Sequence, residues 1–275
     1  MTGLPDTATG DAAIMPVLAD SITKIGPQAE GRVVVSGSHG GIYPASLAIT
    51  GGCRAFILHD AGRGLDHAGT AGLRWAEQFG AAAAAIDYQS APIGQAAIML
   101  AKGIVSQANA YARACGVSPG MACAQAARLL ADAKMPSGNF SQISEAREVL
   151  QPEGTKRRLI LMDSASLVEP QDAGQVIVTG SHGALFGNDP MNALRVDAAF
   201  VLFNDAGGMA TSRLPLLEQR GIAAATVAAS SAHIGDAHST WRDGVISSVN
   251  AIAQRHGLHA GMRASQSVSL MLATD

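Results

Sequence analysis

The sequence has few aromatic side chains, few charged residues and few cysteines, and each shortage excludes a class of protein. Only 4% of the 275 residues are aromatic and 15% are charged, while 48% are hydrophobic and 31 are glycine. A disordered chain needs low hydrophobicity and high charge, so this composition excludes one. With little aromatic volume, the core must consist of Ala, Val, Ile and Leu. Alanine-rich helices on Val- and Ile-rich strands, with glycine at the turns, favour an α/β fold.

Basic residues are also scarce. Nineteen Lys and Arg against 22 Asp and Glu give a formal net charge of −3, and only four of the basic residues are lysines. The longest basic run is the three residues 156–158. A nucleic-acid-binding surface needs a basic stripe that neutralises phosphates, so the sequence predicts no nucleic-acid partner.

Cysteine usage and hydropathy predict the compartment. Cys53, Cys115 and Cys123 form no CxxC pair, so neither a disulfide framework nor a structural zinc site is expected. The first 18 residues lack the basic and apolar regions of a secretory signal. No apolar run approaches the roughly 20 residues of a membrane helix. We therefore predict a cytoplasmic protein with no membrane partner, and we leave open whether it forms a homo-oligomer.

The chain resembles itself at a fixed interval. Residues 20–39 and 163–182 are identical at ten of twenty positions, at a constant offset of 143. The match continues through HDAG and NDAG, through SAPIG and SAHIG, and on to the C-terminus. We interpret this as a tandem duplication. It predicts two α/β lobes with mainly parallel sheets, related by a pseudo-twofold axis.

The repeats set the expected domain boundaries. The first repeat is predicted to span 13–131 and the second 159–275. The segment 132–158 is more polar and holds two prolines and two glycines, which predicts a linker with a short helix at 143–150. Within each repeat, the Gly-Ser-His-Gly segment is expected to end a strand and open a helix. A ligand is expected between the lobes, beyond the carboxyl ends of the strands.

Polar clusters follow matching strands in both repeats, and the sheet topology should bring them together. They are the Gly-Ser-His-Gly, Asp-Ala-Gly and Ser-Ala-x-Ile-Gly segments, to which the Asp-Ser pairs at 20–21 and 163–164 can be added. The candidate catalytic residues are Ser38, His39, Asp60, Ser181, His182, Asp205, His233 and Asp236. The candidate substrate-binding residues are Gly37, Gly40, Gly41, Gly180, Gly183, Asn204, Ser90 and Ser231.

Each cluster has a chemical and a structural interpretation. The two histidines, His39 and His182, are expected to act as general acid and base, because imidazole titrates near neutral pH. An aspartate of each repeat would orient the ring, and glycine-turn amides would bind a carboxylate or an oxyanion. Ser38 and Ser181 are candidate nucleophiles or oxyanion donors. The structural alternatives are a helix cap for serine, an Asx-turn for aspartate and a tight turn for the glycines.

The repeats also differ in ways that an asymmetric site would require. Pro92 and Gln95 of the first repeat correspond to His233 and Asp236 of the second. Nitrogen and oxygen donors of this kind suit zinc or manganese. The candidate ligands are His182, Asp205, His233, Asp236 and His238. The predicted cofactor is none or a divalent metal, and no nucleotide-binding motif is present.

Together these patterns predict an enzyme with a small-molecule substrate. The leading hypothesis is a hydrolase that cleaves an amide or cyclic-amide C–N bond in a small, polar, carboxylate-bearing molecule. Two alternatives stay open. Two pseudo-symmetric His/Asp clusters facing one substrate would suit an isomerase, racemase or lyase that works by two-base proton transfer, and the same cleft would serve a non-catalytic binding protein.

Overall fold

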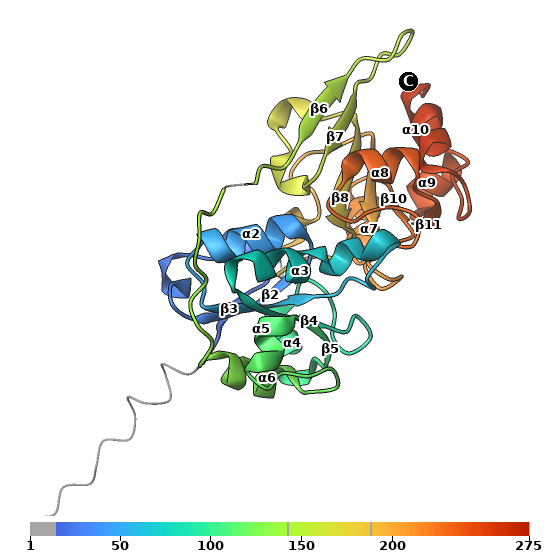
Figure 1. Ribbon diagram of the computed structural model, residues 1–275. Helices are drawn as coiled ribbons and strands as arrows, with labels where there is room; N and C mark the ends of the chain where they lie inside the picture. Colours follow the sequence, from blue (N-terminus) through green and yellow to red (C-terminus); the bar gives the residue numbers. More distant parts are fainter. Residues whose placement is uncertain (1–14, 142, 188, 275) are drawn as a thin grey trace, which may run out of the picture.

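A computed structural model describes residues 15–141, 143–187 and 189–274. These residues form two sheets flanked by helices, with five strands in the first half of the chain and six in the second. The two halves lie against each other, and the segment that joins them runs along one side of the molecule (Figure 1). The predicted α/β class with mostly parallel sheets is therefore confirmed.

The first sheet has the strand order β1-β2-β3-β4-β5. Its strands are β1 (Val17–Ala19), β2 (Val33–His39), β3 (Ala55–His59), β4 (Ala82–Ile86) and β5 (Val105–Ala108). The first four are parallel, and β5 runs antiparallel to β4. Every residue of β3 and β4 is buried, which explains why their sequences show uninterrupted apolar runs instead of alternation.

Helices cover both faces of the first sheet (Figure 1). One face packs against α2 (Ile42–Thr50) and α3 (Ala71–Ala76), over a core that includes Phe56. The other face packs against the remaining three helices, over a core that includes Met99. These helices are α4 (Ala96–Lys102), α5 (Ala110–Ala114) and α6 (Cys123–Leu130). The alanines of β4 let the helices approach the sheet closely.

The second sheet has the order β11-β10-β9-β8-β7-β6. Its strands are β6 (Arg147–Leu150), β7 (Leu159–Met162), β8 (Val176–His182), β9 (Phe200–Asn204), β10 (Ala223–Val227) and β11 (Ile246–Val249). Strands β7 to β10 are parallel, while β6 and β11 are antiparallel to their neighbours. One face carries α7 (Arg213–Gln219). The other carries α8 (Ala237–Arg242), α9 (Ala251–Arg255) and α10 (Ala264–Leu272).

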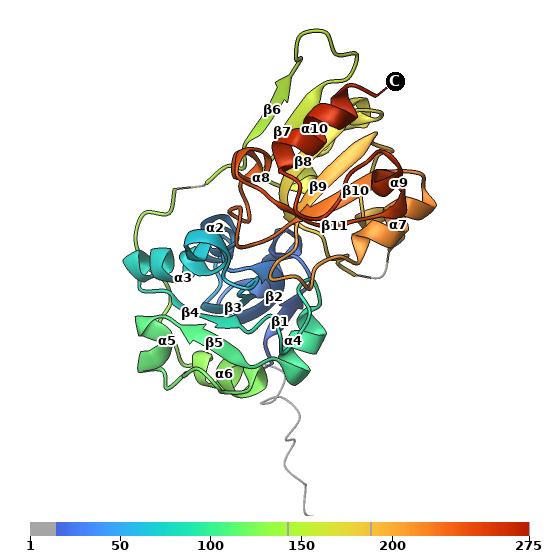
Figure 2. The same ribbon diagram turned by 90° about the vertical axis from the view of Figure 1, so that its right-hand side faces the viewer.

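The prediction of a short helix at 143–150 is wrong, because this segment contains strand β6. The strand pairs with β7 from Arg147↔Met162 to Leu150↔Leu159, and the hairpin extends away from the rest of the molecule (Figure 2). Arg147 Nη2 lies 2.7 Å from the buried Asp172 carboxylate. Partners from the second half, which local sequence does not reveal, therefore hold this segment extended.

The helix expected after Gly-Ser-His-Gly forms in only one half. In the first half, α2 follows β2 as predicted. In the second half the prediction is wrong, because the described residues after β8 hold only a short 3-10 turn, Pro190–Asn192, before β9. Gly187 has a φ of 63°, which a right-handed helix does not use, and Pro190 lacks an amide hydrogen.

A small apolar cluster joins the two halves. It contains Ile93 and Ile234 from the two Ser-Ala-x-Ile-Gly segments, with alanines from both halves. The Leu65 amide also donates to the Ala229 carbonyl at 2.8 Å, from the first half to the second. The isoleucines of this motif therefore pack in the contact between the two halves.

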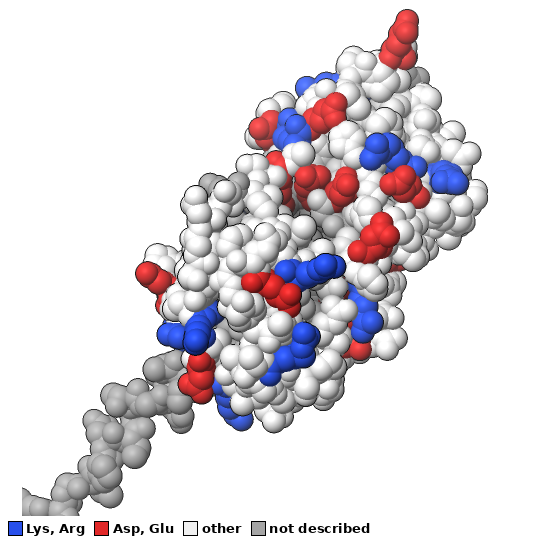
Figure 3. Space-filling view, in the orientation of Figure 1, with Lys and Arg blue, Asp and Glu red and all other residues white. Residues whose placement is uncertain are grey.

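On the face shown in Figure 3, basic and acidic side chains are interspersed and no stripe of one sign forms. None of the helices in the described part of the chain combines the length and apolar content needed to cross a lipid bilayer.

Candidate active site

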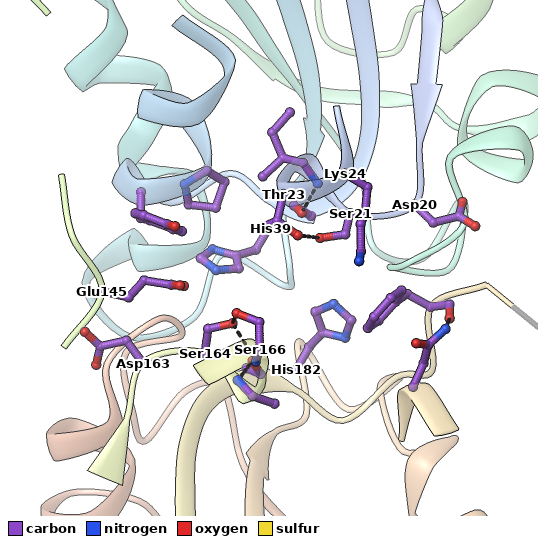
Figure 4. A pocket seen from close by; sticks show the side chains of 18 of the residues that line it. Asp20, Ser21, Thr23, Lys24, His39, Glu145, Asp163, Ser164, Ser166 and His182 are labelled. Carbon is purple, nitrogen blue, oxygen red and sulfur yellow. Dashed lines mark hydrogen bonds between the residues drawn. The ribbon is translucent and has the colours of Figure 1, made fainter. Parts of the chain in front are cut away.

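A cavity of about 120 Å³ lies between the two halves (Figure 4). Its walls contain residues at corresponding positions of the two repeats. From the first half these are Asp20, Ser21, Thr23, Ser38 and His39. From the second half they are Asp163, Ser164, Ser166, Ser181 and His182. The cavity thus lies beyond the carboxyl ends of β1 and β2 in one sheet and of β7 and β8 in the other, where parallel sheets bind ligands.

The two serines that precede the histidines shape the cavity wall. Ser38 Oγ accepts a hydrogen bond from the Ile22 amide at 3.0 Å, and Ser181 Oγ accepts one from the Ala165 amide at 2.9 Å. Each hydroxyl therefore fixes a 3-10 turn, the one that follows β1 in the first half and the one that follows β7 in the second. Among the described residues, neither hydroxyl bonds to an imidazole, so neither has the adjacent base that activates a serine nucleophile.

His39 is a half-buried, neutral imidazole whose tautomer is set by the backbone. The Gly41 amide donates to Nδ1 at 3.2 Å, so the neutral ring carries its proton on Nε2. Desolvation, with a smaller contribution from the neighbouring His59, lowers the pKa of His39 from 6.5 to about 4. The ring reaches the second half, since a Cβ built on Gly235 would lie 3.2 Å from Cε1.

His182 faces the same cavity from the second half (Figure 4). Burial lowers its pKa well below 6.5; the Arg213 charge, His39 and His59 act in the same direction, and the Ala184 backbone offsets part of the shift. Its Nδ1 is buried and has no hydrogen-bond partner in the described chain. Both cavity histidines are therefore neutral at pH 7, and His182 keeps an unused ring nitrogen.

Arg213 is a buried cation in the cavity wall. Its side chain is at the start of α7 and the residue is only 3% exposed. Burial lowers its pKa to about 10, which leaves the guanidinium charged at neutral pH. In the ranges that the structure describes, no carboxylate forms an ion pair with it.

A carboxyl group from the linker also enters the site. Glu145 points into the cavity between His39 and Asp163 (Figure 4). Burial raises its pKa to about 7, while hydrogen bonds from Tyr43 of the first half and Ser164 of the second partly counteract that rise. Glu145 therefore connects both halves at the cavity and titrates near neutrality.

The two strand-end aspartates do not orient the histidines, and this expectation is corrected. Asp60 Oδ1 accepts the Gly62 and Tyr88 amides at 3.0 Å. Asp205 Oδ1 accepts the Gly207 and Ala229 amides at 3.1 and 2.9 Å. The carboxylates close Asx-turns and tie neighbouring loops, because a buried carboxylate needs several donors and backbone amides are nearest.

The predicted glycines lie outside the cavity wall. The amides of Gly40 and Gly183 donate to the His59 and Asn204 carbonyls at 2.8 Å, and the Gly41 amide is used by His39. These amides are consumed within the protein, so they form no oxyanion hole. Gly37 and Gly180 allow close backbone packing: a Cβ on either would lie 2.5–2.7 Å from backbone atoms.

The remaining substrate-binding candidates also make internal bonds. Ser90 Oγ donates to the Asp87 carbonyl at 2.7 Å, and Ser231 Oγ makes the same bond to Ala228 at 2.7 Å. Asn204 donates to the Ala232 carbonyl at 3.2 Å from inside the core. None of the three candidates borders the cavity.

The candidate metal ligands are dispersed. His233 Nε2 pairs with Asp66 at 2.8 Å, His238 pairs with Glu148 at 2.9 Å, and Asp236 caps α8. No three side chains of His, Cys, Asp or Glu gather as a metal-binding group within the part of the chain that the structure describes. These residues do not fit the predicted metal site, and no step of the chemistry below uses one.

Comparison with known proteins does not assign a class. A scan against protein-family models, a search of curated proteins and a search of solved structures each gave no match to this chain.

Sequence reasoning missed Arg213, Glu145 and Tyr43. For Arg213 a signal existed: the segments that follow it and Gly72 align as LPLLEQRG and LRWAEQFG, so arginine replaces glycine at one position. Glu145 lies in the segment interpreted as a linker. Nothing local distinguishes it from a solvated glutamate.

Proposed function

We propose that the protein is an enzyme that moves protons to and from a small molecule held between its halves, with His39 and His182 as the acid–base pair. The observation that carries the proposal is that two neutral imidazoles from opposite halves border one small cavity. A substrate between them exposes two of its faces to the rings. This arrangement suits an isomerase, racemase or lyase: His182, whose Nδ1 is unused, takes a proton from carbon, while the His39 side of the cavity delivers one, which the Glu145 carboxyl beside His39 supplies.

Two observations favour this chemistry over the hydrolase expected from sequence. Ser38 and Ser181 lack an adjacent base, so a serine nucleophile has no activating partner among the described residues. The glycine-turn amides are consumed by the protein, so they cannot stabilise the oxyanion of an amide hydrolysis.

Hydrolysis of a C–N bond is the second candidate, and Glu145 favours it. A carboxyl group with a pKa of about 7 is protonated in about half of the molecules at neutral pH, and this form can deliver its proton to a leaving nitrogen. In that case a neutral imidazole would take a proton from the attacking water.

We also propose that the halves arose by tandem duplication and are related by a pseudo-twofold axis. In support, β1 to β5 and β7 to β11 occur in the same order, and corresponding contacts recur. The Asn109 and Asn250 caps are one example. The predicted cytoplasmic location and the question of a homo-oligomer stay predictions.

Deuterium incorporation tests the proposed chemistry. The full-length protein is incubated in D₂O with two- to four-carbon hydroxy, amino and keto acids and with small cyclic amides, and products are followed by NMR. We expect deuterium at the carbon next to a carboxyl group. His39→Ala and His182→Ala should each slow this exchange by about 10²- to 10⁴-fold, because each removes a positioned proton-transfer group.

The control for these variants is His259→Ala, which removes an exposed imidazole outside the cavity and should exchange at the wild-type rate. Circular dichroism verifies that each variant is folded. C–N cleavage without deuterium at carbon would establish the second candidate instead. Binding of these molecules without either reaction, or folded histidine variants at full activity, would overturn the acid–base proposal.

A further inference from the structure

Arg213 uses only part of its hydrogen-bonding capacity. Nε donates to the Ala184 carbonyl and Nη1 to the Ala193 carbonyl, each at 3.0 Å. In the described chain Nη2 makes no hydrogen bond. A guanidinium has five N–H donors, so more than half of its donor capacity is unused by the protein.

The surroundings of this cation are apolar. Its central carbon lies 4.9 Å from the Phe203 ring centroid and 5.8 Å from that of Phe186. A buried charge is costly unless a counter-charge or hydrogen bonds compensate it, and the aromatic faces and two carbonyls compensate only in part. The cavity is the one place from which an anion can reach the guanidinium, because Arg213 borders it and is otherwise enclosed.

Only the second half carries a buried cation in the cavity wall, because the other basic wall residues, Lys24 and Arg195, are exposed. The Arg213 amide donates to the Gly183 carbonyl at 2.9 Å, and the Gly72 amide makes the same bond to Gly40 at 2.9 Å. The two residues therefore occupy matching backbone positions. A Cβ on Gly72 would lie 2.3 Å from the Gly41 carbonyl oxygen, so the first half has no room for a side chain there.

The volume of the cavity limits what the cation can bind. An engineered cavity of about 150 Å³ holds benzene, so about 120 Å³ has room for about five or six non-hydrogen atoms. A planar guanidinium with free donors matches the two oxygens of a carboxylate. A three-carbon acid has this size and this charge.

We infer that Arg213 is the receptor for the carboxylate of a three- or four-carbon acid, which binds with its carboxylate beside His182 and its other end toward His39. The inference rests on the proposed function only in treating the bound acid as the substrate. Because Gly72 offers no matching receptor, the acid binds in one orientation although the cavity walls correspond in pairs.

Calorimetry on the full-length protein tests the assignment. The probes are propanoate, both enantiomers of lactate, and pyruvate, compared with the corresponding amides and with inorganic phosphate. We expect at least one acid to bind, its amide to bind at least tenfold more weakly, and phosphate to bind more weakly than the acid. Arg213→Gln should lose at least tenfold in affinity, and Arg213→Lys should lose less because it keeps the charge.

Arg255→Gln is the matched control, since it removes an exposed arginine of α9 from the same half and should bind as wild type does. If Arg213→Gln does not fold, the Arg213 Nε–H resonance of the wild-type protein replaces it: the acid should shift this resonance and the amide should not. Equal binding of acid and amide, preferred phosphate, full affinity in Arg213→Gln, an unshifted resonance or no binding of any acid would each overturn the inference.

These outcomes separate the inference from the proposed function. His39→Ala and His182→Ala should lose deuterium exchange yet still bind the acid. Arg213-dependent binding without exchange of any acid would overturn the proposed chemistry and leave the receptor assignment in place. Deuterium exchange that persists in Arg213→Gln would overturn the receptor assignment and leave the proposed chemistry in place.

Discussion

At the scale of single residues, the Asp-Ala-Gly turns account for a close contact between the halves. Gly62 and Gly207 have φ values of 68° and 91°, and the preceding alanines, Ala61 and Ala206, also lie in the left-handed region. A Cβ on Gly62 would lie 2.6 Å from the Gly207 Cα. The repeated glycine is therefore required both by conformation and by the approach of two backbones.

Because of this contact, we expect substitution of Gly62 to lower the free energy of unfolding more than substitution of Gly208. Gly62→Ala should lower the free energy of unfolding by about 2–4 kcal/mol, because it combines about 1 kcal/mol or more of backbone strain with a steric clash. Gly208→Ala is the control. Its φ is 87° but nothing lies within 4 Å, so it should cost only the strain. Urea unfolding measures both, and equal losses would contradict the role of the contact.

At the scale of elements, one asparagine in each half connects a helix to a strand. Asn109 Oδ1 accepts the Ala83 and Ala112 amides at 3.1 and 2.9 Å, and Nδ2 donates to the Leu73 and Ala81 carbonyls. Asn250 makes the corresponding four bonds in the second half. One amide thus caps a helix and bonds the buried strand beside it.

Removal of this amide should therefore destabilise either half. Asn109→Ala and Asn250→Ala should each lower the free energy of unfolding by about 2–4 kcal/mol, because each leaves buried backbone groups without partners. Asn139→Ala, at an exposed position, should change it by less than about 0.5 kcal/mol. Thermal and urea unfolding test this, and a loss as small as that of Asn139→Ala would contradict the prediction.

The sequence predicted elements best where the signal was local. The Gly-Ser-His-Gly segments end strands in both halves as expected, and α2 follows the first of them. The segment 143–150 failed because its partners are distant in sequence: Arg147 pairs with Asp172, and Glu148 pairs with His238. Helical propensity was overridden by tertiary pairing.

At the scale of the whole molecule, buried histidines make stability depend on pH. The folded-state pKa of His39 is lowered from 6.5 to about 4, so between these values the unfolded chain binds a proton that the folded chain does not. Stability is therefore lost as pH falls from about 6.5 to 4. At 1.36 kcal/mol per pKa unit this loss is about 3 kcal/mol for His39. His182 acts in the same direction.

We expect His39→Gln to remove this dependence. Between pH 7 and pH 4, the variant should gain about 3 kcal/mol of unfolding free energy relative to wild type. His259→Gln, which removes an exposed imidazole, should keep the wild-type profile. Denaturant unfolding at several pH values measures this. Parallel curves for wild type and His39→Gln would show that the imidazole is not buried in its neutral form.

Glu145 should have the opposite effect. Its folded-state pKa is raised from 4.5 to about 7, so the folded chain binds the extra proton and this group stabilises the fold increasingly as pH falls from 7 to 4.5. Glu145→Gln should therefore lose stability relative to wild type over that range. A variant whose stability tracks wild type across this range would contradict the burial of the carboxyl group.

The sequence by itself determined the element types of most segments and the position of two histidines at strand ends, because periodicity, turns and strand direction are local properties. Only the tertiary structure decided which groups meet. Asp60 and Asp205 bond backbone amides instead of imidazoles, and the expected metal ligands separate. Arg213 and Glu145 join the cavity from a helix and a linker. A buried polar group takes the donors that packing places nearest, and those come from segments far away in the chain.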